Sequence, residues 1–417
     1  MTPPSRDSAA RAFPWLLTAG IMLVALNLRA PIVALAPVLE RIEAELGLTP
    51  ATAGLLTTLA VLCFSLATPL AALVIRLSGA ERAVVIALLG VLAGTILRSA
   101  DGAPTAFAGM VVIGAAITIG NVVMPVVIRR DVPPDRAPLV TGVYTAMLNV
   151  GTMITSLATA PLADLVGWRL ATAAWGVFVL AALVVWGAYL RRRRRDDAPE
   201  PEPALTTAEL LTGGIAVVDD RAGPGASDSA WRNPLTWLLT AAFAAQAWGY
   251  YGVTSWLPTM LADLRGIGEV AAGAASSVFQ VAAIVGALGV PLLGARTPQW
   301  VPAALIGALW MTLPIGLLVA PEAYLLWEFL GGIAQGGGFV VIFTVVVRHA
   351  RSDREAGGMS AIVQGVGYLL AALSPPLLGA MHAATAGWAL PLVVLIGSTS
   401  TFLVLAVVAT RMTDARR

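Results

Sequence analysis

Two ionisable side chains that lie deep in apolar runs are the residues best placed to do chemistry in this chain. Arg29 lies just past the middle of the first run, and Glu328 lies about two turns into the tenth. The planar guanidinium of arginine offers five N–H donors in a fork that matches a small anion or a polarised nitro group, so Arg29 is a candidate substrate anchor. Glu328 has no cation near it in sequence, and burial favours the neutral carboxyl, so it is a candidate proton-coupling site. The alternatives are an Arg29 that pairs structurally with a carboxylate or helix carbonyls, and a Glu328 that is wetted at the rim or paired with an arginine.

Neutral polar residues near the middle of other apolar runs form a second group of candidates. Amide and phenol groups at such depths either line a wet pocket or hydrogen-bond neighbouring helices, and tyrosine rings also offer faces to a flat ligand. Together with Arg29, the predicted substrate-binding residues are Asn27, Asn121, Tyr144, Asn149, Gln246, Tyr250, Gln280, Gln335, Gln364 and Tyr368. A cavity with one cation, several amides and several phenols suits a compact anion or a small polar heteroaromatic, and it suits a sugar or a polycation badly.

The residue inventory excludes most enzyme classes. A single cysteine, Cys63, and two histidines, His349 and His382, leave no zinc, haem or multi-thiolate site, so we expect no metal and no cofactor. No nucleophile–base pair or phosphate-binding loop can be assembled from the chain, so we do not expect an enzyme. The arginine run Arg191 to Arg195 indicates membrane topology and a contact with anionic lipid, not a nucleic-acid site.

Composition indicates that the elements that position these residues are transmembrane helices. The chain of 417 residues is 58% hydrophobic and only 12% charged, whereas soluble domains carry roughly 25% charged residues. About 20 apolar residues are needed to cross a bilayer as a helix. We predict twelve such spans, at residues 14–38, 51–77, 82–99, 105–129, 138–163, 168–190, 234–261, 270–294, 300–319, 322–347, 356–381 and 388–410.

The distribution of arginine predicts the orientation of these spans. With a cytoplasmic N-terminus, 21 of the 26 arginines lie on the cytoplasmic side, four lie outside (Arg41, Arg98, Arg169 and Arg265) and one, Arg29, lies in the membrane. The positive-inside rule therefore predicts cytoplasmic termini and a multi-pass protein of the bacterial inner membrane. The first span could be taken for a cleaved signal peptide, but it is longer than such segments and Arg29 interrupts it.

Residues 191–232 divide the chain into two similar halves. This polar stretch predicts a mostly disordered cytoplasmic linker between an N-terminal six-helix bundle, 1–190, and a C-terminal one, 233–417. Landmarks recur in both halves: Asp135-Arg136 precedes Gly167-Trp168 with much the same spacing as Asp353-Arg354 precedes Gly387-Trp388. Twelve helices in two parallel six-helix repeats are the architecture of the major facilitator superfamily.

The repeated Asp-Arg pairs lie in two basic clusters that have two readings. They can be topology signals alone, or they can form salt bridges between the halves that close an inner gate and break as the halves rock. The residues predicted for this cytoplasmic gate are Arg130, Asp131, Asp135, Arg136, Asp353 and Arg354.

Several short motifs resemble the cyanate permease and 2-nitroimidazole transporter family of that superfamily. They are Asn27-Leu28-Arg29, Gly54-Leu55-Leu56-Thr57-Thr58-Leu59, Ile119-Gly120-Asn121, the turn Arg129-Arg130-Asp131-Val132-Pro133, Thr141 to Asn149, Gly167-Trp168-Arg169 and, more loosely, Gln364 to Tyr368. The segment Ile75-Arg76-Leu77-Ser78-Gly79 departs from the general superfamily signature because it lacks an acidic residue before its arginine. The resemblance implies an all-α membrane fold and a small substrate of the cyanate or nitroimidazole kind.

We therefore expect a secondary transporter that works by alternating access, with proton coupling resting on Glu328 alone. Its partners are a small-molecule substrate, the lipid bilayer and protons, and a monomer is sufficient for the mechanism. The alternatives are a sensor that keeps the fold without turnover, a channel, and an efflux carrier for small drug-like compounds. The linker is too polar and too short to be the folded module that a sensor would need.

Overall fold

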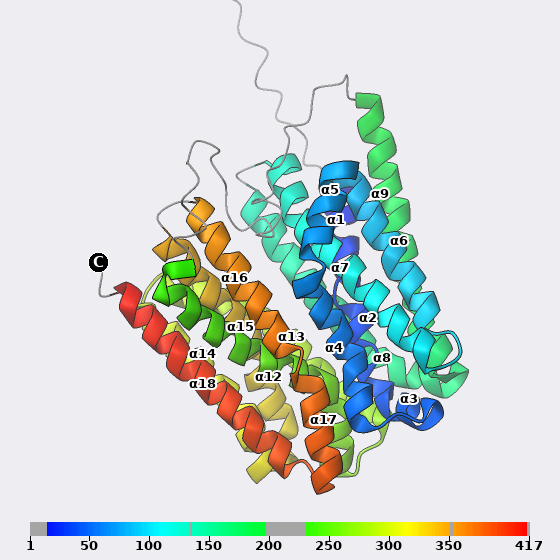
Figure 1. The fold of residues 1–417 in the computed structure, drawn as a ribbon, viewed down its shortest axis with the longest axis vertical. Coiled ribbons are helices and arrows are strands. Elements are labelled where there is room, and N and C mark those ends of the chain that lie inside the picture. The colour runs from blue at the N-terminus through cyan, green and yellow to red at the C-terminus, as the bar shows by residue number, and fades with distance from the viewer. Residues whose placement is uncertain (1–14, 134–135, 197–230, 351–352, 415–417) are drawn as a thin grey trace, which may run out of the picture.

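The computed structural model is entirely helical in the residues that it describes, which are 15–133, 136–196, 231–350 and 353–414 (Figure 1). The first part contains α1 (Trp15–Asn27), α2 (Ala30–Val33), the 3₁₀ turn η1 (Ala36–Val38), α3 (Leu39–Leu46), α4 (Pro50–Leu66), α5 (Thr68–Ser78), α6 (Ala80–Arg98), α7 (Ala103–Asp131), α8 (Ala137–Ala174) and α9 (Gly176–Asp196). The second contains α12 (Pro234–Arg265), α13 (Glu269–Gly294), α14 (Trp300–Val319), η2 (Pro321–Ala323), α15 (Tyr324–His349), α16 (Asp353–Ala371), α17 (Ser374–Thr385) and α18 (Ala389–Asp414). Most of the predicted linker lies outside the described residues.

Apolar helices of membrane length dominate both parts. Among the described residues, nine helical segments are long and apolar enough to cross a membrane, or ten if the bent pair α4 and α5 is one span. One of them, Val140–Arg193, has 54 residues, which at about 1.5 Å per residue is too long for a single crossing. Gly167 inside it has a φ of 78°, a left-handed conformation that turns the chain between the predicted spans 138–163 and 168–190. Each of the twelve predicted spans overlaps one or more helices, and the count of twelve itself stays a prediction.

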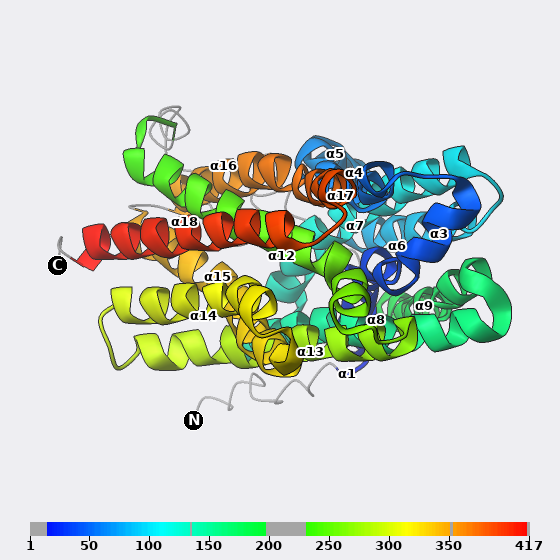
Figure 2. The same ribbon diagram turned by 90° about the horizontal axis from the view of Figure 1, so that it is seen from below.

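The helices pack into two bundles that lie side by side (Figures 1 and 2). One buried hydrophobic cluster is built from residues between Leu17 and Trp186. The other is built almost entirely from residues between Leu235 and Ala409. The predicted division into bundles at 1–190 and 233–417, with a linker between them, stays a prediction.

Several of the predicted spans are interrupted, and the breaks in two of them, 14–38 and 51–77, bear on the site. The span at 14–38 is interrupted after Asn27, continues as the short α2 and ends in η1. The span at 51–77 bends by 58° between α4 and α5. Prolines at the start of α2, η1 and α5 explain these positions, because proline fits the first turn of a helix but cannot donate a hydrogen bond to the turn before it.

The two bundles pack tightly against each other at the end of the molecule that carries α3, which we call the α3 end (Figure 1). A Cβ atom on Gly54 of α4 would lie 2.6 Å from the carbonyl carbon and oxygen of Pro375 in α17. A Cβ atom on Gly273 of α13 would lie 2.8 Å from the carbonyl oxygen of Ser156 in α8. Glycine is therefore required for backbones of opposite halves to approach this closely. The hydroxyl of Thr58 strengthens the same seam by donating to the carbonyl oxygen of Ala372 at 2.7 Å.

Candidate transport site

The break in the first span places Arg29 outside regular helix geometry. Arg29 is the N-cap of α2, with φ −139° and ψ −34°, and Pro31 follows in the first turn. Because proline has no N–H and restricts the residue before it, a helix interrupted at this point is what the sequence Asn27 to Pro31 favours. The interruption lies at membrane depth, where irregular backbone is tolerated only if it is buried in protein or lines a cavity.

Arg29 lines a pocket between the two bundles. The polar side chains in the wall are Arg29, Thr57 of α4, and Tyr250, Tyr251, Thr254 and Ser255 of α12. The apolar ones are Ile32, Val33, Ala36 and Phe64. Since α4 belongs to the first bundle and α12 to the second, a ligand in this pocket touches both halves. That position is where a carrier must bind its substrate if the halves are to rock around it.

The guanidinium of Arg29 is surrounded by phenols and lacks a counter-ion. Its Cζ atom lies 5.6 Å from the ring centroid of Tyr250. Tyr144, Tyr251 and Tyr368 also lie close enough to interact with it electrostatically. Within the described part of the chain, no carboxylate pairs with Arg29 and no hydrogen bond engages its N–H groups. A half-buried cation without an anion is energetically costly. An incoming anion would therefore be stabilised both by the positive charge and by the free N–H donors.

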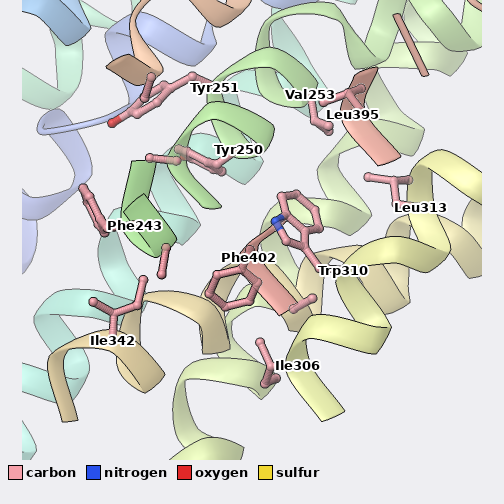
Figure 3. Close-up of a cluster of buried hydrophobic side chains, with 14 of the residues drawn as sticks. Phe243, Tyr250, Tyr251, Val253, Ile306, Trp310, Leu313, Ile342, Leu395 and Phe402 are labelled. Carbon is pink, nitrogen blue, oxygen red and sulfur yellow. The ribbon is translucent and has the colours of Figure 1, made fainter. Parts of the chain in front are cut away.

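The tyrosines form a connected aromatic surface beside the guanidinium. The ring centroids of Tyr250 and Tyr251 are 4.9 Å apart, and those of Tyr251 and Tyr368 are 6.2 Å apart. Phe64 of α4 packs edge-on against Tyr368 at 5.7 Å, which extends the surface across both halves. In Figure 3, Tyr251 directs its hydroxyl away from the core residue Trp310. Tyr251 was not among the predicted residues, although its position next to Tyr250 on α12 was a signal for it.

The predicted amides are not among the residues of the pocket wall; two of them join different helices, and two bond within their own helix. Gln246 donates to the carbonyl oxygen of Gln335 at 3.1 Å, and Gln280 accepts from Thr152 of the opposite half at 3.3 Å. Asn27 donates to Leu23 O at 2.8 Å, and Asn149 donates to Thr145 O at 3.1 Å. Asn121 and Gln364 are half-buried and are not part of the pocket wall. The substrate-binding role of all seven predicted amides, Gln335 included, therefore stays a prediction.

Three hydroxyls in the wall were not among the predicted residues. Thr57 and Ser255 lie 3.0 Å apart, oxygen to oxygen, and so connect α4 with α12 across the halves. Thr254 is buried, and its Oγ1 has no hydrogen-bond partner among the described residues. An unsatisfied hydroxyl in a pocket wall is a ready donor or acceptor for a polar ligand. Thr57 lies inside a motif that carried the family resemblance, which was the available signal.

Glu328 lies apart from the pocket, inside the second bundle. Its side chain is 0% exposed, and neither carboxyl oxygen has a hydrogen-bond partner among the described residues. The helix α15 that carries it packs between α13 and α14, where the indole Nε1 of Trp310 and the Nε2 of Gln335 are also unpaired. A carboxyl group buried in this way is strongly disfavoured as an unpaired anion.

At the opposite end from α3, the predicted gate residues Arg130 and Asp131 belong to an ion-pair cluster of the first bundle. Arg130 pairs with Glu81 and with Asp131, the latter at 2.9 Å, and Arg193 of α9 reaches the same two carboxylates. Burial lowers the pKa of the Arg130 guanidinium, but the Asp131 and Glu81 carboxylates outweigh that effect and raise it. Arg136 is exposed and has interaction partners of its own. Asp135 lies outside the described residues, as do the side chains of Asp353 and Arg354, so the inter-half gate stays a prediction.

An ion pair joins the two halves at the α3 end. Arg41 of α3 donates from Nε to Glu269, the first residue of α13, and from Nη2 to Asp164 of α8 at 2.7 Å. Glu269 belongs to the second bundle and Asp164 to the first. From the sequence, Arg41 was predicted only to lie on the external side. Its carboxylate partners are 123 and 228 residues away, so the local sequence does not indicate the pairing.

Comparison with known proteins decides the family. The family model described as Major Facilitator Superfamily matches residues 17–327. The chain belongs to this superfamily. It is 34% identical to the 2-nitroimidazole transporter of Escherichia coli (strain K12) over 378 residues, which is 90% of each chain. It is 31% identical to an uncharacterised transporter of Bacillus subtilis (strain 168), covering 92% of this chain and 90% of that one. With the cyanate transport protein of Escherichia coli (strain K12) it shares 24% identity, over 85% of this chain and 87% of the relative.

Solved structures of superfamily members share the fold. A D-xylose–proton symporter matches with a TM-score of 0.68 at 12% identity, over 96% of this chain and 97% of that one. A bacterial homologue of the human lysosomal transporter Spinster, in an inward-facing and unoccupied conformation, matches with a TM-score of 0.66 at 18% identity, over 96% and 95%. The resemblance to the cyanate permease and 2-nitroimidazole transporter family is thus confirmed, and the protein is a multi-pass membrane transporter and not an enzyme.

Proposed function

We propose that this superfamily member carries a small anion, or a small heteroaromatic bearing a polarised nitro group, by alternating access. The observation that carries the proposal is the Arg29 guanidinium, which faces tyrosines of both halves and has no carboxylate partner in the described residues. Cyanate is a compact anion, and a nitro group concentrates negative charge on two oxygens that fit the guanidinium fork. Two relatives, a 2-nitroimidazole transporter and a cyanate transport protein, have names that fall within this chemistry.

The proposed topology has twelve crossings, cytoplasmic termini and a location in the bacterial inner membrane. The arginine distribution supports this orientation, because 21 of 26 arginines then lie inside. In that orientation the α3 end faces outward, so the tight packing at Gly54 and Gly273 corresponds to a carrier that is closed to the outside. A monomer is sufficient, since the pocket is built from one chain.

Transport into liposomes tests this function. Purified protein reconstituted into liposomes is expected to exchange labelled cyanate or 2-nitroimidazole for the unlabelled compound, with saturation. Equal competition by a neutral sugar would contradict the proposed substrate class, and flux without saturation or counterflow would indicate a channel. Efflux of drug-like compounds from everted membrane vesicles, without uptake of the small solutes, would favour the drug-efflux alternative. The family assignment does not favour a sensor without turnover.

Glu328→Gln is expected to abolish proton-driven accumulation while leaving counterflow within about twofold of wild type. The glutamine keeps the size of the side chain but cannot take up a proton, and a fully buried carboxyl without a partner is the feature that suits proton binding. The measurement is uptake against a concentration gradient, driven by an imposed pH difference.

Glu322→Gln is the matched control, because Glu322 lies six residues earlier and is exposed. It is expected to accumulate substrate as the wild type does. If Glu328→Gln also accumulates substrate normally under the pH gradient, Glu328 does not couple transport to protons.

A further inference from the structure

Arg98 is a buried cation that the pocket does not include. It is the last residue of α6, at the end of its predicted span, and its side chain is only 1% exposed. In the described residues no carboxylate pairs with it, and its Nε has no partner. Burying a charge without a counter-ion is energetically costly, so we expect the hydrogen bonds that Arg98 makes to have a structural role.

One of those bonds ends on the break in the first helix. Nη1 of Arg98 donates to the carbonyl oxygen of Pro31. In a regular helix this carbonyl would accept from the amide of Leu35, but here that amide bonds to Ile32 O at 3.4 Å. Leaving a buried carbonyl without a hydrogen-bond partner destabilises the folded state. Arg98 therefore satisfies a backbone group that the break has orphaned.

The second bond anchors the guanidinium to a different helix. Nη2 of Arg98 donates to the carbonyl oxygen of Thr172 at 3.2 Å, near the end of α8. The last four carbonyls of a helix have no partner within the helix, so Thr172 O is also available. The Oγ of Ser99 lies 3.3 Å from the Oγ1 of Thr172 and holds the same junction. One side chain on α6 thus fixes α2 against the end of α8.

We infer that Arg98 is a positioning residue for substrate binding and acts through Arg29 without touching the substrate. Only Ala30 separates Arg29 from Pro31, so a shift of the Pro31 carbonyl moves the Arg29 backbone and the guanidinium that it carries. The short helix α2 has four residues, too few to hold its own orientation without an external bond. This inference rests on the proposed role of Arg29 as the substrate anchor.

A double-mutant cycle tests the inference with cyanate as the probe, measured by titration calorimetry on purified protein. Arg98→Leu is expected to raise the Kd about tenfold, while Arg98→Lys, which can still donate to both carbonyls, stays within about threefold of wild type. In an Arg29→Lys background, which keeps the charge and a measurable affinity, Arg98→Leu is expected to cost less than twofold, because the fork it positions is gone. Arg265→Leu, at an exposed helix end, is the control and is expected to leave the Kd unchanged.

The outcomes separate this inference from the proposed function. If Arg29→Lys alone leaves cyanate affinity unchanged, the proposed anchor is wrong and the inference falls with it. If Arg29→Lys weakens binding but Arg98→Leu costs the same tenfold in both backgrounds, or costs nothing, only the role of Arg98 is wrong. Should Arg98→Leu fail to fold, Arg98→Gln takes its place in the cycle, and a loss of affinity in Arg98→Lys equal to that in Arg98→Gln would also overturn the inference.

Discussion

Arg29→Gln is expected to weaken the binding of cyanate about 100-fold and to reduce its transport at low substrate concentration by a similar factor. Hydrogen bonds to charged groups contribute about 1.5–3 kcal/mol each, and the substitution removes two of them together with the only charge in the pocket wall. Each 1.4 kcal/mol corresponds to about a factor of ten in affinity, so two such bonds account for about two orders of magnitude. Neutral 2-nitroimidazole is expected to lose only about tenfold, because its ring still packs against Tyr250 and Tyr251.

The measurement is a calorimetric titration of both ligands on wild type and variant. Arg265→Gln is the matched control, since Arg265 is exposed at the end of α12, the helix that supplies four of the pocket residues. The anchor role fails if both ligands bind the Arg29→Gln variant as tightly as they bind the wild type. In that case the hydroxyls of Thr57, Thr254 and Ser255 become the polar part of the site.

Gly54→Val is expected to reduce transport to less than a tenth of the wild-type rate by preventing closure at the α3 end. Any Cβ atom at residue 54 would lie 2.6 Å from the carbonyl carbon and oxygen of Pro375 and 2.7 Å from the nitrogen of Pro376. These are backbone atoms, which cannot rotate out of the way as the end of a side chain can. The variant should therefore favour the state in which α4 and α17 are apart, and alternating access requires both states.

Electron–electron distance measurement between spin labels reports this shift directly. Labels at Leu165, which is 81% exposed, and at Ala384 on α17, in a Cys63→Ser background, place one probe on each half near the α3 end. Gly54→Val should move the population toward longer distances. Gly397→Val on α18, where an added Cβ meets nothing within 4 Å, is the control and should leave both the distances and the transport rate unchanged. A variant at residue 54 with wild-type distances would show that this contact does not limit closure.

The features that depend on local sequence were the ones that could be predicted. Membrane helices follow from runs of apolar residues, and the family follows from short motifs such as Asn27-Leu28-Arg29, so both were recovered. Arg29 was a candidate because of its charge within an apolar run, and its role in binding stays a prediction. The helix break beside Arg29 could be predicted only in part. Pro31 indicates an irregularity, but the sequence does not show which group bonds to a carbonyl that the break leaves without a helical partner.

Long-range pairing explains what the sequence did not reveal. Arg98 sits at the end of a span and therefore resembles a loop residue, yet its partners at Pro31 and Thr172 are 67 and 74 residues away and are carbonyls, which every residue has. The amides were ambiguous for a similar reason. Gln246 and Gln280 lie near the middle of their predicted spans, but their neighbours on other helices, not their place in the span, decide whether they bond to protein or face the cavity.

The two carboxylates on Arg41 bear on how fast the halves can separate. Asp164 moves with Arg41 because both belong to the first bundle, whereas Glu269 departs with the second. In the proposed cycle, opening of the α3 end separates Arg41 from Glu269, but the guanidinium keeps its ion pair with Asp164. The activation barrier for opening then includes the loss of one partly exposed ion pair, on the order of 1 kcal/mol or less. A single ion pair between the halves would instead leave an unpaired, partly desolvated charge when it broke. A carrier built in this way holds its resting state closed and still turns over without a large electrostatic penalty in each cycle.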